Sequence, residues 1–459
     1  MTPALQVGGA LSKTTLVETA NDQWRILTDL LGWIPLATLV GALAGTASAL
    51  LLVSLNWATD VREAHHWIIA LLPAAGYGVG WVYQRVGQSV AAGNNLILQE
   101  IDNPTGVIPL RMTPLILAGT IITHLFGGSA GREGTAIQTG ASLADQLTHL
   151  FRLSPLTRRI VLMTGISAGF ASVFGTPLAG AVFGMEVLAF GALTYEALVP
   201  CTLAAFAGDL TTRAWHVHHT VYTVHELPPL GVTTLLSAVA AGICFGLMAL
   251  LFARLTHAIG HLSKLIPSAP MRPVVGGVLV AVAVFSLGTT KYVGLGIPTI
   301  VASFDHQLPI WDFAAKTVFT SVTLGTGFKG GEVTPLFYIG ATLGNALSNI
   351  LPLPTSLLAG MGFVAVFAGA ANTPLASTFM AFELFGGEAG AFCAVACVLS
   401  YLFSGHDGIY SAQRLGFGKV PGYSKLAPAP SDHPELVAAK EHVLPDGPPT
   451  RRAGVSTPF

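Results

Sequence analysis

The chain has 459 residues, of which 52% are hydrophobic and only 10% charged, and its mean hydropathy is +0.64. Soluble domains of this size do not reach such values, so the composition excludes a soluble globular protein and predicts a polytopic membrane protein. The formal net charge of −1 excludes a nucleic-acid partner, because such binding needs a strongly basic face.

The first residues predict a cytoplasmic N-terminal segment over residues 1–29. This stretch carries charges from Lys13 to Arg25 and has no apolar core, so it is not a cleavable signal peptide.

The apolar segments that follow are expected to be helices of very different lengths. Residues 333–382 contain no Lys, Arg, Asp, Glu or His, and this stretch is long enough for more than one span of about 20 residues. Several segments are too short to cross a bilayer alone, so we expect re-entrant or broken helices. The expected segments are 33–57, 65–84, 112–128, 134–150, 158–172, 176–191, 195–211, 229–253, 274–290, 309–325, 333–349, 355–371, 374–386 and 389–404.

The second group of segments repeats the first. The block Gly140-Ala-Ser-Leu143 recurs as Gly340-Ala-Thr-Leu343, a shift of 200 residues, and Thr176-Pro-Leu-Ala179 recurs as Thr373-Pro-Leu-Ala376, a shift of 197. Blocks that keep their order and nearly their spacing indicate an internal repeat. Each half has about seven apolar segments, and an odd number of crossings predicts inverted repeats of a transporter fold.

The repeat fixes the expected domain organisation. It predicts membrane repeats at residues 30–212 and 229–412, joined by a linker at 213–228 that lies outside the cell. Residues 413–459 are rich in proline and mixed in charge, which predicts a cytoplasmic, mostly disordered tail.

The loop at Gly127–Thr135 is the strongest functional candidate. It sets Arg132 and Glu133 among glycines, directly before a helical segment, in an otherwise charge-free part of the chain. A carboxylate at membrane depth is tolerated only where it faces protein or a water-filled cavity, and a helix N-terminus attracts anions. We therefore predict an anion site at the repeat interface. Matching interruptions at Gly93–Leu96, Gly294–Pro298 and the Glu332 loop belong to it.

Three blocks resemble the CLC family of chloride channels and proton-coupled anion antiporters over residues 30–415. They are Gly131-Arg-Glu-Gly134, Gly331-Glu-Val-Thr-Pro335 and Tyr410. The resemblance implies an all-α, CLC-like polytopic membrane protein of two inverted repeats with broken helices. It also implies that Glu133 is the gating carboxylate, that the Tyr410 hydroxyl binds the anion, and that the protein is a homodimer in the lipid bilayer of a bacterial inner membrane, with both termini cytoplasmic.

The chain departs from the chloride-type pattern in a consistent way. Thr135 replaces a proline, Asn94 replaces the central serine, Val333 and Thr334 replace phenylalanine and alanine, Val187 stands where chloride antiporters keep an internal glutamate, and Glu332 is an additional acid. These features are similar to those of the fluoride-selective branch, so the resemblance implies export of fluoride in exchange for protons without a cofactor.

The resemblance gives the remaining candidate residues their roles. Asn94, Val333, Thr334 and Tyr410 would bind the anion, and Glu332 would be a second proton-carrying or anion-coupling group. The supporting loop residues would be Gly93, Asn95, Gly131, Arg132, Gly134, Thr135, Gly331 and Pro335.

Other interpretations of these residues remain open. Arg132 could anchor its loop through backbone carbonyls, Asn94 could be a helix N-cap, and Thr334 could serve either the anion or Glu332. Glu332 could also be a structural carboxylate paired with Lys329 or Lys316. The paired acids Glu186 and Glu383, at equivalent repeat positions, are expected to bind backbone or a basic residue rather than to transport ions.

Two rival functions are kept. One is a chloride/proton antiporter or a chloride channel of the same family. The other is a membrane hydrolase, either a serine hydrolase at Ser167, because Gly165-Ile-Ser-Ala-Gly169 matches a nucleophile-elbow pattern, or a metal-dependent one at the histidines of the linker. No metal site is expected, since the linker histidines lack an accompanying acid cluster; they are His216, His218, His219 and His225.

Overall fold

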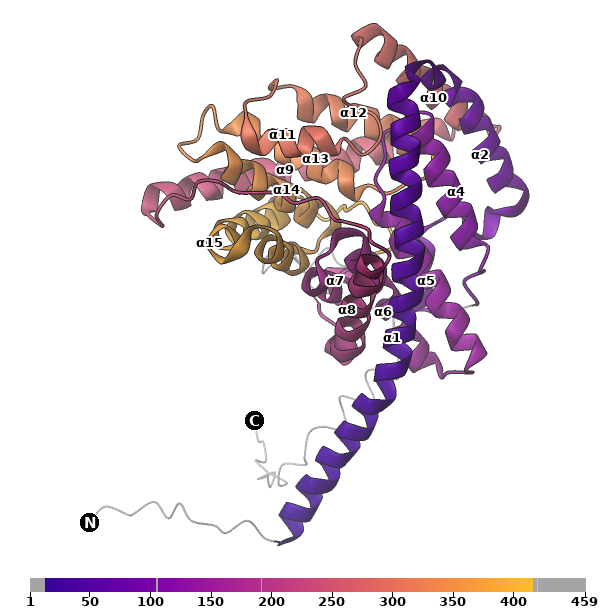
Figure 1. Cartoon of the computed structure of the whole chain (residues 1–459), viewed down its shortest axis with the longest axis vertical. Coiled ribbons are helices and arrows are strands. Elements are labelled where there is room, and N and C mark those ends of the chain that lie inside the picture. Colours follow the sequence, from indigo (N-terminus) through magenta and orange to yellow (C-terminus); the bar gives the residue numbers. More distant parts are fainter. Residues whose placement is uncertain (1–12, 105, 191, 416–418, 420–459) are drawn as a thin grey trace, which may run out of the picture. The chain divides into compact units, whose positions relative to one another are not determined.

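The structure, a computed structural model, describes residues 13–104, 106–190, 192–415 and 419. The predictions for residues 1–12 and for the tail beyond residue 419 lie outside the described residues. The described residues are helical, with one pair of two-residue strands among them (Figure 1). The helices of the first half are α1 (Lys13–Ala64), α2 (Leu72–Val86), α3 (Asn94–Asp102), α4 (Met112–Leu125), α5 (Glu133–Leu150), α6 (Pro155–Phe174), α7 (Pro177–Glu186) and α8 (Leu198–Ala214).

The second half repeats this order. Its helices are α9 (Val232–Ser263), α10 (Met271–Leu287), α11 (Ile297–Asp305), α12 (Asp312–Gly325), α13 (Val333–Leu347), α14 (Thr355–Ala371) and α15 (Pro374–Phe403). Short 3-10 turns occur at His66–Leu71, Gln88–Val90 and Tyr195–Ala197, and the strands β1 (Ala189–Phe190) and β2 (Arg414–Leu415) pair in parallel.

Three of the described helices are long and apolar enough to cross a membrane. They comprise Leu30–Ala64 within α1, Val232–Ser263 and Pro374–Phe403. The last one is not a continuous helix, because Gly386 has φ 82° and ψ 175°, far from helical values. The segments expected at 374–386 and 389–404 therefore meet at this break.

Two helices were not expected from the sequence. Helices α3 and α11 have nine residues each and lie at equivalent places in the two halves. Both segments are too short to be recognised as membrane spans from their apolar composition. Each follows a glycine with positive φ, Gly93 before α3 and Gly296 before α11. They were recognised only as glycine-rich interruptions.

The two halves meet through reciprocal backbone contacts. Gly131 N–H donates to the Gly331 carbonyl at 2.6 Å, and Gly331 N–H donates to the Gly131 carbonyl at 2.8 Å. The two residues are 200 positions apart, so equivalent points of the two repeats touch each other. This exchange sets the loop before α5 against the loop before α13.

A second reciprocal contact links α7 and α15, which lie side by side (Figure 1). Glu186, at the end of α7, accepts hydrogen bonds from the N–H groups of Leu375 and Ala376 at 3.0 and 2.8 Å. Glu383 accepts from Leu178 and Ala179, both at 2.8 Å. Each carboxylate thus satisfies the free N–H groups at the start of the opposite helix. The expectation that these acids bind backbone is confirmed.

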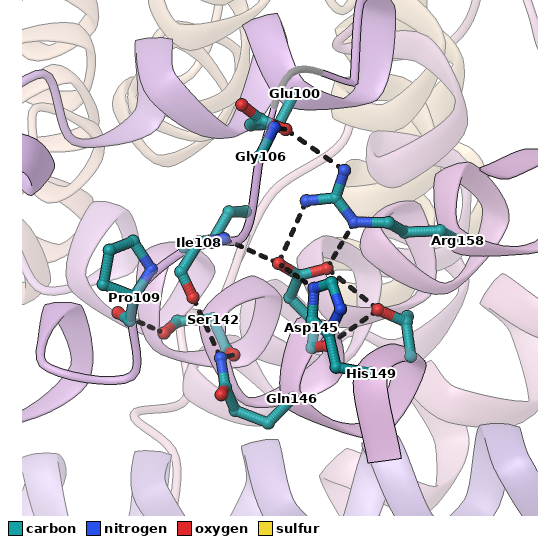
Figure 2. A network of polar contacts seen from close by, with 10 residues as sticks. Glu100, Gly106, Ile108, Pro109, Ser142, Asp145, Gln146, His149 and Arg158 are labelled. Carbon is teal, nitrogen blue, oxygen red and sulfur yellow. Dashed lines mark hydrogen bonds and ion pairs between the residues drawn. The ribbon is translucent and has the colours of Figure 1, made fainter. Parts of the chain in front are cut away.

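A buried polar network fixes the position of α3. Arg158 at the start of α6 donates to both oxygens of Asp145 on α5 at 2.6 and 3.0 Å, and to Glu100 on α3 at 3.1 Å (Figure 2). Asp145 also accepts from the N–H of Ile108 at 2.7 Å. A guanidinium shared by two acids locks α3 and the segment after it onto α5 and α6. The start of α3, at Asn94, is positioned by the same network.

Aromatic rings fill the contact between the halves beside these loops. Phe170 of α6 and Phe183 of α7 stack on each other at 4.4 Å, and each lies 5.9 Å from Phe367 of α14. Phe337 of α13 stacks on Phe363 of α14 at 4.2 Å. These fully buried rings hold α13 rigidly, so that its first turn has a fixed position.

Candidate functional site

The Glu133 carboxylate lies at the first turn of α13, in the other half of the chain. Its Oε2 accepts from the N–H of Thr334 at 2.9 Å and from the N–H of Arg132 at 3.2 Å. The Thr334 hydroxyl lies 2.7 and 2.6 Å from the two carboxylate oxygens. Glu133 is 0% exposed, so its charge is stabilised by these donors and by the helix N-terminus rather than by water. The carboxylate occupies a position suited to an anion.

Thr334 is therefore a ligand of Glu133. The sequence left it between the anion and Glu332, and the contact across 201 residues to Glu133 was not foreseen. Val333, the first residue of α13, is fully buried and brings Thr334 to this point.

Glycine is required where the two loops cross. A Cβ on Gly331 would lie 2.6 Å from the backbone N of Gly134, and a Cβ on Gly131 would lie 2.9 Å from Pro335 Cδ and 3.0 Å from the Glu133 carboxylate. A side chain at either position would clash at these distances and push the two loops apart. The close approach of the loops therefore requires glycine at both positions. Gly131, Gly134, Gly331 and Pro335 thus lie in close contact where the two loops cross.

Three helix N-termini converge beside Glu133. A Cβ on Gly134, in the first turn of α5, would lie 3.2 Å from the amide nitrogen of Asn94 at the start of α3, and 3.7 Å from Oε2 of Glu332, which directly precedes α13. The bare face of Gly134 is therefore bordered by an amide donor and by a carboxylate. Helix N-termini with free donors are suited to anion binding.

A cavity of about 130 Å³ adjoins this point. Its wall includes Asn94, Glu332 and Tyr410, together with Gln138 and Lys329. The Tyr410 hydroxyl, Oδ1 of Asn94 and Oε2 of Glu332 are buried and have no hydrogen-bond partner among the described residues. Buried polar atoms normally have partners, so three such atoms around one cavity indicate a place for a polar ligand or water.

The neighbouring residues hold these groups in position. Asn95 Oδ1 accepts from the N–H of Ala412 at 3.0 Å, which fastens the segment after Tyr410 to the start of α3. The hydroxyls of Thr135 and Thr120 lie 2.6 Å apart and join the first turn of α5 to α4. Gly93 has φ 59° and packs against Gln138, where a Cβ would lie 3.2 Å from the Gln138 amide.

Glu332 also faces a larger cavity. A space of about 550 Å³ shares Glu332 and Asn95 with the smaller one, and its other walls carry Lys264 and Arg272. Glu332 thus lies between the cavity of about 130 Å³ and the larger one. We call the larger cavity the basic vestibule, because Lys264 and Arg272 line it. A titratable group at such a boundary can exchange protons with water in the vestibule.

Val187 has an apolar environment. It shares a small void of about 10 Å³ with Asn94, Tyr410 and apolar side chains. A void of this size and lining holds no water chain. A proton route at Val187, where the resemblance places an internal glutamate in chloride antiporters, is absent from this part of the described structure.

The structure decides between several interpretations that the sequence left open. Asn94 does not cap α3, because it is the first helical residue and no side-chain cap bond is made. Neither lysine pairs with Glu332, since Lys316 donates to the carbonyls of Tyr292 and Gly294 at 3.1 and 2.8 Å, and Lys329 forms no ion pair within the described residues.

The contacts of Arg132 do not support its interpretation as a loop anchor. Its Nε has no hydrogen-bond partner among the described residues and lies 3.6 Å from Glu133 Oε1. The guanidinium therefore adds positive charge beside the Glu133 carboxylate.

Sequence reasoning missed Gln138 as a site residue and treated Lys329 only as a partner of Glu332. The available signal was their position, since Gln138 lies on the first turns after the Glu133 loop and Lys329 is a charge in a membrane-depth glycine loop.

The enzyme interpretation gains no structural support. Ser167 lies inside α6, where its hydroxyl is 3.4 Å from the Ala181 carbonyl, and the strand–turn–helix of a nucleophile elbow does not occur there. Of the linker histidines considered as metal ligands, His225 places its Nε2 2.9 Å from Oδ1 of Asp305. Within residues 13–415, apart from 105 and 191, no group of three His, Cys, Asp or Glu side chains is placed to hold a metal.

Comparison with known proteins agrees with this geometry. Residues 75–405 match the family described as voltage gated chloride channel. A relative from Pseudomonas syringae pv. tomato, described as a chloride/fluoride channel protein, is 56% identical over 92% of this chain and 95% of its own length. An H(+)/Cl(−) exchange transporter from Vibrio vulnificus is 24% identical over 76% of this chain and 81% of its own length.

Solved structures give the same fold. A CLC-type fluoride/proton antiporter is similar with a TM-score of 0.82 and 33% identity, over 84% of this chain and 99% of that chain. A slow cyanobacterial Cl⁻/H⁺ antiporter has a TM-score of 0.73 at 19% identity, over 82% of this chain and 96% of that one. The predicted all-α polytopic fold with CLC-like repeats is thereby confirmed. From the family match and the 56% identity, the chain is a member of the voltage gated chloride channel (CLC) family of membrane ion channels and transporters.

Proposed function

We propose that this protein is a secondary antiporter that exports fluoride in exchange for protons. The observation that carries the proposal is the Glu133 carboxylate on the first turn of α13, beside a cavity with unpartnered buried polar atoms. An ionised Glu133 occupies the anion position, and a protonated Glu133 loses its attraction to the helix N-terminus and leaves. Anion binding and proton binding then exclude each other at one site, which is the requirement for exchange.

The roles of the other residues follow from this competition. The N–H groups at Val333 and Thr334 and the Thr334 hydroxyl bind fluoride once Glu133 leaves, and Asn94 and Tyr410 bind it in the adjoining cavity. Glu332 receives the proton and passes it to the basic vestibule. Fluoride is small and strongly hydrated, so several strong donors are needed to replace its water.

Fluoride rather than chloride is supported by one similar solved structure and by the residues themselves, and one relative is described with both ions. The similar solved structure is described as a fluoride/proton antiporter and the Pseudomonas relative as a chloride/fluoride channel protein. Asn94 offers two N–H donors where a serine offers one. Val187, in its apolar surroundings, removes the proton station that the resemblance assigns to chloride antiporters.

The cellular setting belongs to the same proposal. The protein acts as a homodimer in a bacterial inner membrane, with both termini cytoplasmic, repeats at residues 30–212 and 229–412, an outside linker at 213–228 and a cytoplasmic tail from 413. The large exposed apolar side chains of α7, α8 and α15 supply surface for lipid or for a second copy.

Ion flux from liposomes tests the proposal. Purified protein should release fluoride faster than chloride and move protons in the opposite direction, and both ions should be followed with selective electrodes. Equal chloride and fluoride flux with proton movement would favour the rival chloride/proton antiporter. Fluoride flux without proton movement would make the protein a channel.

A further inference from the structure

Lys329 is a basic side chain in the anion cavity that the transport scheme above does not use. It is the single Lys or Arg among the residues that line the 130 Å³ cavity, and it shares that wall with Asn94, Glu332 and Tyr410. Its ammonium therefore adds a positive charge to the cavity whose wall carries the unpartnered atoms of Asn94, Glu332 and Tyr410.

The ammonium of Lys329 is held by an aromatic ring rather than by an acid. Its Nζ lies 4.0 Å from the ring centre of Tyr83, and its stem fills the space left by Gly119 on α4, where a Cβ would lie 2.9 Å from Lys329 Cβ. Among the described residues no carboxylate lies within 4.0 Å of Nζ. A ring face attracts the ammonium without supplying a counter-charge, so no acid within 4.0 Å offsets the charge of the ammonium.

A role in fastening the loop does not require a lysine. Ser129, 200 residues earlier, occupies the equivalent position in the first repeat. Its hydroxyl lies 2.8 Å from that of Thr320, and its N–H donates to the Thr323 hydroxyl at 3.1 Å. A small polar residue thus holds the matching loop, so fastening this loop does not by itself require the charge of a lysine.

We propose that Lys329 is a fluoride-binding residue that allows the anion and an ionised Glu332 to occupy the cavity together. Glu332 alone repels an anion that enters its cavity, and the ammonium of Lys329 offsets this repulsion. An ammonium is also a compact, strongly hydrated charge with three donors, which matches a small anion. The inference rests on the proposed anion transport and adds a specificity-determining residue to it.

The test compares fluoride affinity in Lys329→Gln, Lys329→Arg and Arg254→Gln. Arg254 is the control, because it is a cation whose side chain is 66% exposed and does not line the cavity. Lys329→Gln should raise the fluoride Kd and the transport KM roughly ten- to a hundredfold, the loss expected for one hydrogen bond to a charged group. Lys329→Arg should recover most of the affinity, and Arg254→Gln should leave it unchanged.

A second variant separates electrostatics from folding. In Lys329→Gln, fluoride affinity should fall further as the internal pH rises and Glu332 ionises, and the double variant Lys329→Gln/Glu332→Gln should lose this pH dependence. Calorimetric titration of fluoride into solubilised protein gives the Kd independently of transport. An unchanged Kd in Lys329→Gln, or a changed Kd without any link to pH or to Glu332, would overturn the inference.

Failure of the proposed function would look different. If the wild type bound and moved chloride but not fluoride, the same variants would be titrated with chloride, and a lysine-dependent chloride Kd would sustain an anion-binding Lys329 while the fluoride assignment fell.

Discussion

Replacing Glu133 with glutamine should uncouple anion movement from proton movement. The carboxylate accepts hydrogen bonds from two N–H groups and from the Thr334 hydroxyl, in a site that is 0% exposed. A hydrogen bond to a charged group contributes about 1.5–3 kcal/mol and a neutral one about 0.5–1.5 kcal/mol, so neutralising the acceptor weakens each bond by about 1 kcal/mol. Three bonds give about 3 kcal/mol, or roughly a hundredfold lower occupancy of the α13 first turn by the side chain.

The assay is simultaneous recording of fluoride and pH from liposomes that contain Glu133→Gln. Proton movement driven by a fluoride gradient should vanish, and the protein should still fold because the amide keeps the size of the acid and can still form hydrogen bonds. Glu186→Gln is the matched control: Glu186 also binds two N–H groups at a helix start, but away from the cavity, so its variant should keep coupling and lose only stability. A wild-type ratio of protons to fluoride in Glu133→Gln would refute the reasoning and leave Glu133 as a loop residue.

The other predictions address selectivity, the proton route and stability. Asn94→Ser should lower the preference for fluoride over chloride without reducing abundance, since one donor replaces two; an unchanged anion ratio in flux assays would remove Asn94 from the site. Glu332→Gln should suppress exchange of both ions with Glu133 intact, whereas normal coupled exchange in this variant would exclude Glu332 from the proton route. Arg158→Gln should destabilise the protein by about 3–5 kcal/mol, because it leaves the buried Asp145 and Glu100 carboxylates without their cation, and a thermal melt that matches wild type would contradict this.

Local features of the fold could be predicted because they depend on neighbouring residues. The glycines and the single acid at Gly131–Gly134 predict a loop followed by the start of a helix, and α5 begins at Glu133. The recurrence of Thr176-Pro-Leu-Ala179 at Thr373 marks equivalent helix starts, and the structure has helices beginning at Pro177 and Pro374. Apolar composition over long segments likewise predicts the membrane helices.

Contacts between the halves could not be predicted from one sequence. Thr334 meets Glu133 across 201 residues, and nothing in either loop specifies which carboxylate the hydroxyl approaches. The same limit applies to Glu332, for which the sequence suggested Lys316 or Lys329 as an ion-pair partner. In the structure Lys316 donates to backbone carbonyls and Lys329 packs on the ring of Tyr83. Charge proximity along a chain does not give proximity in space.

The reciprocal bonds of Glu186 and Glu383 have a consequence for biosynthesis. The first half emerges from the ribosome with the N–H groups of Leu178 and Ala179 at the start of α7 still lacking their acceptor, because Glu383 is made about two hundred residues later. A polar group without a partner in the apolar phase costs several kcal/mol. The first half therefore reaches its lowest free energy only after the second has been translated and inserted, and a truncated chain that ends before Glu383 keeps two N–H groups at the start of α7 without this acceptor.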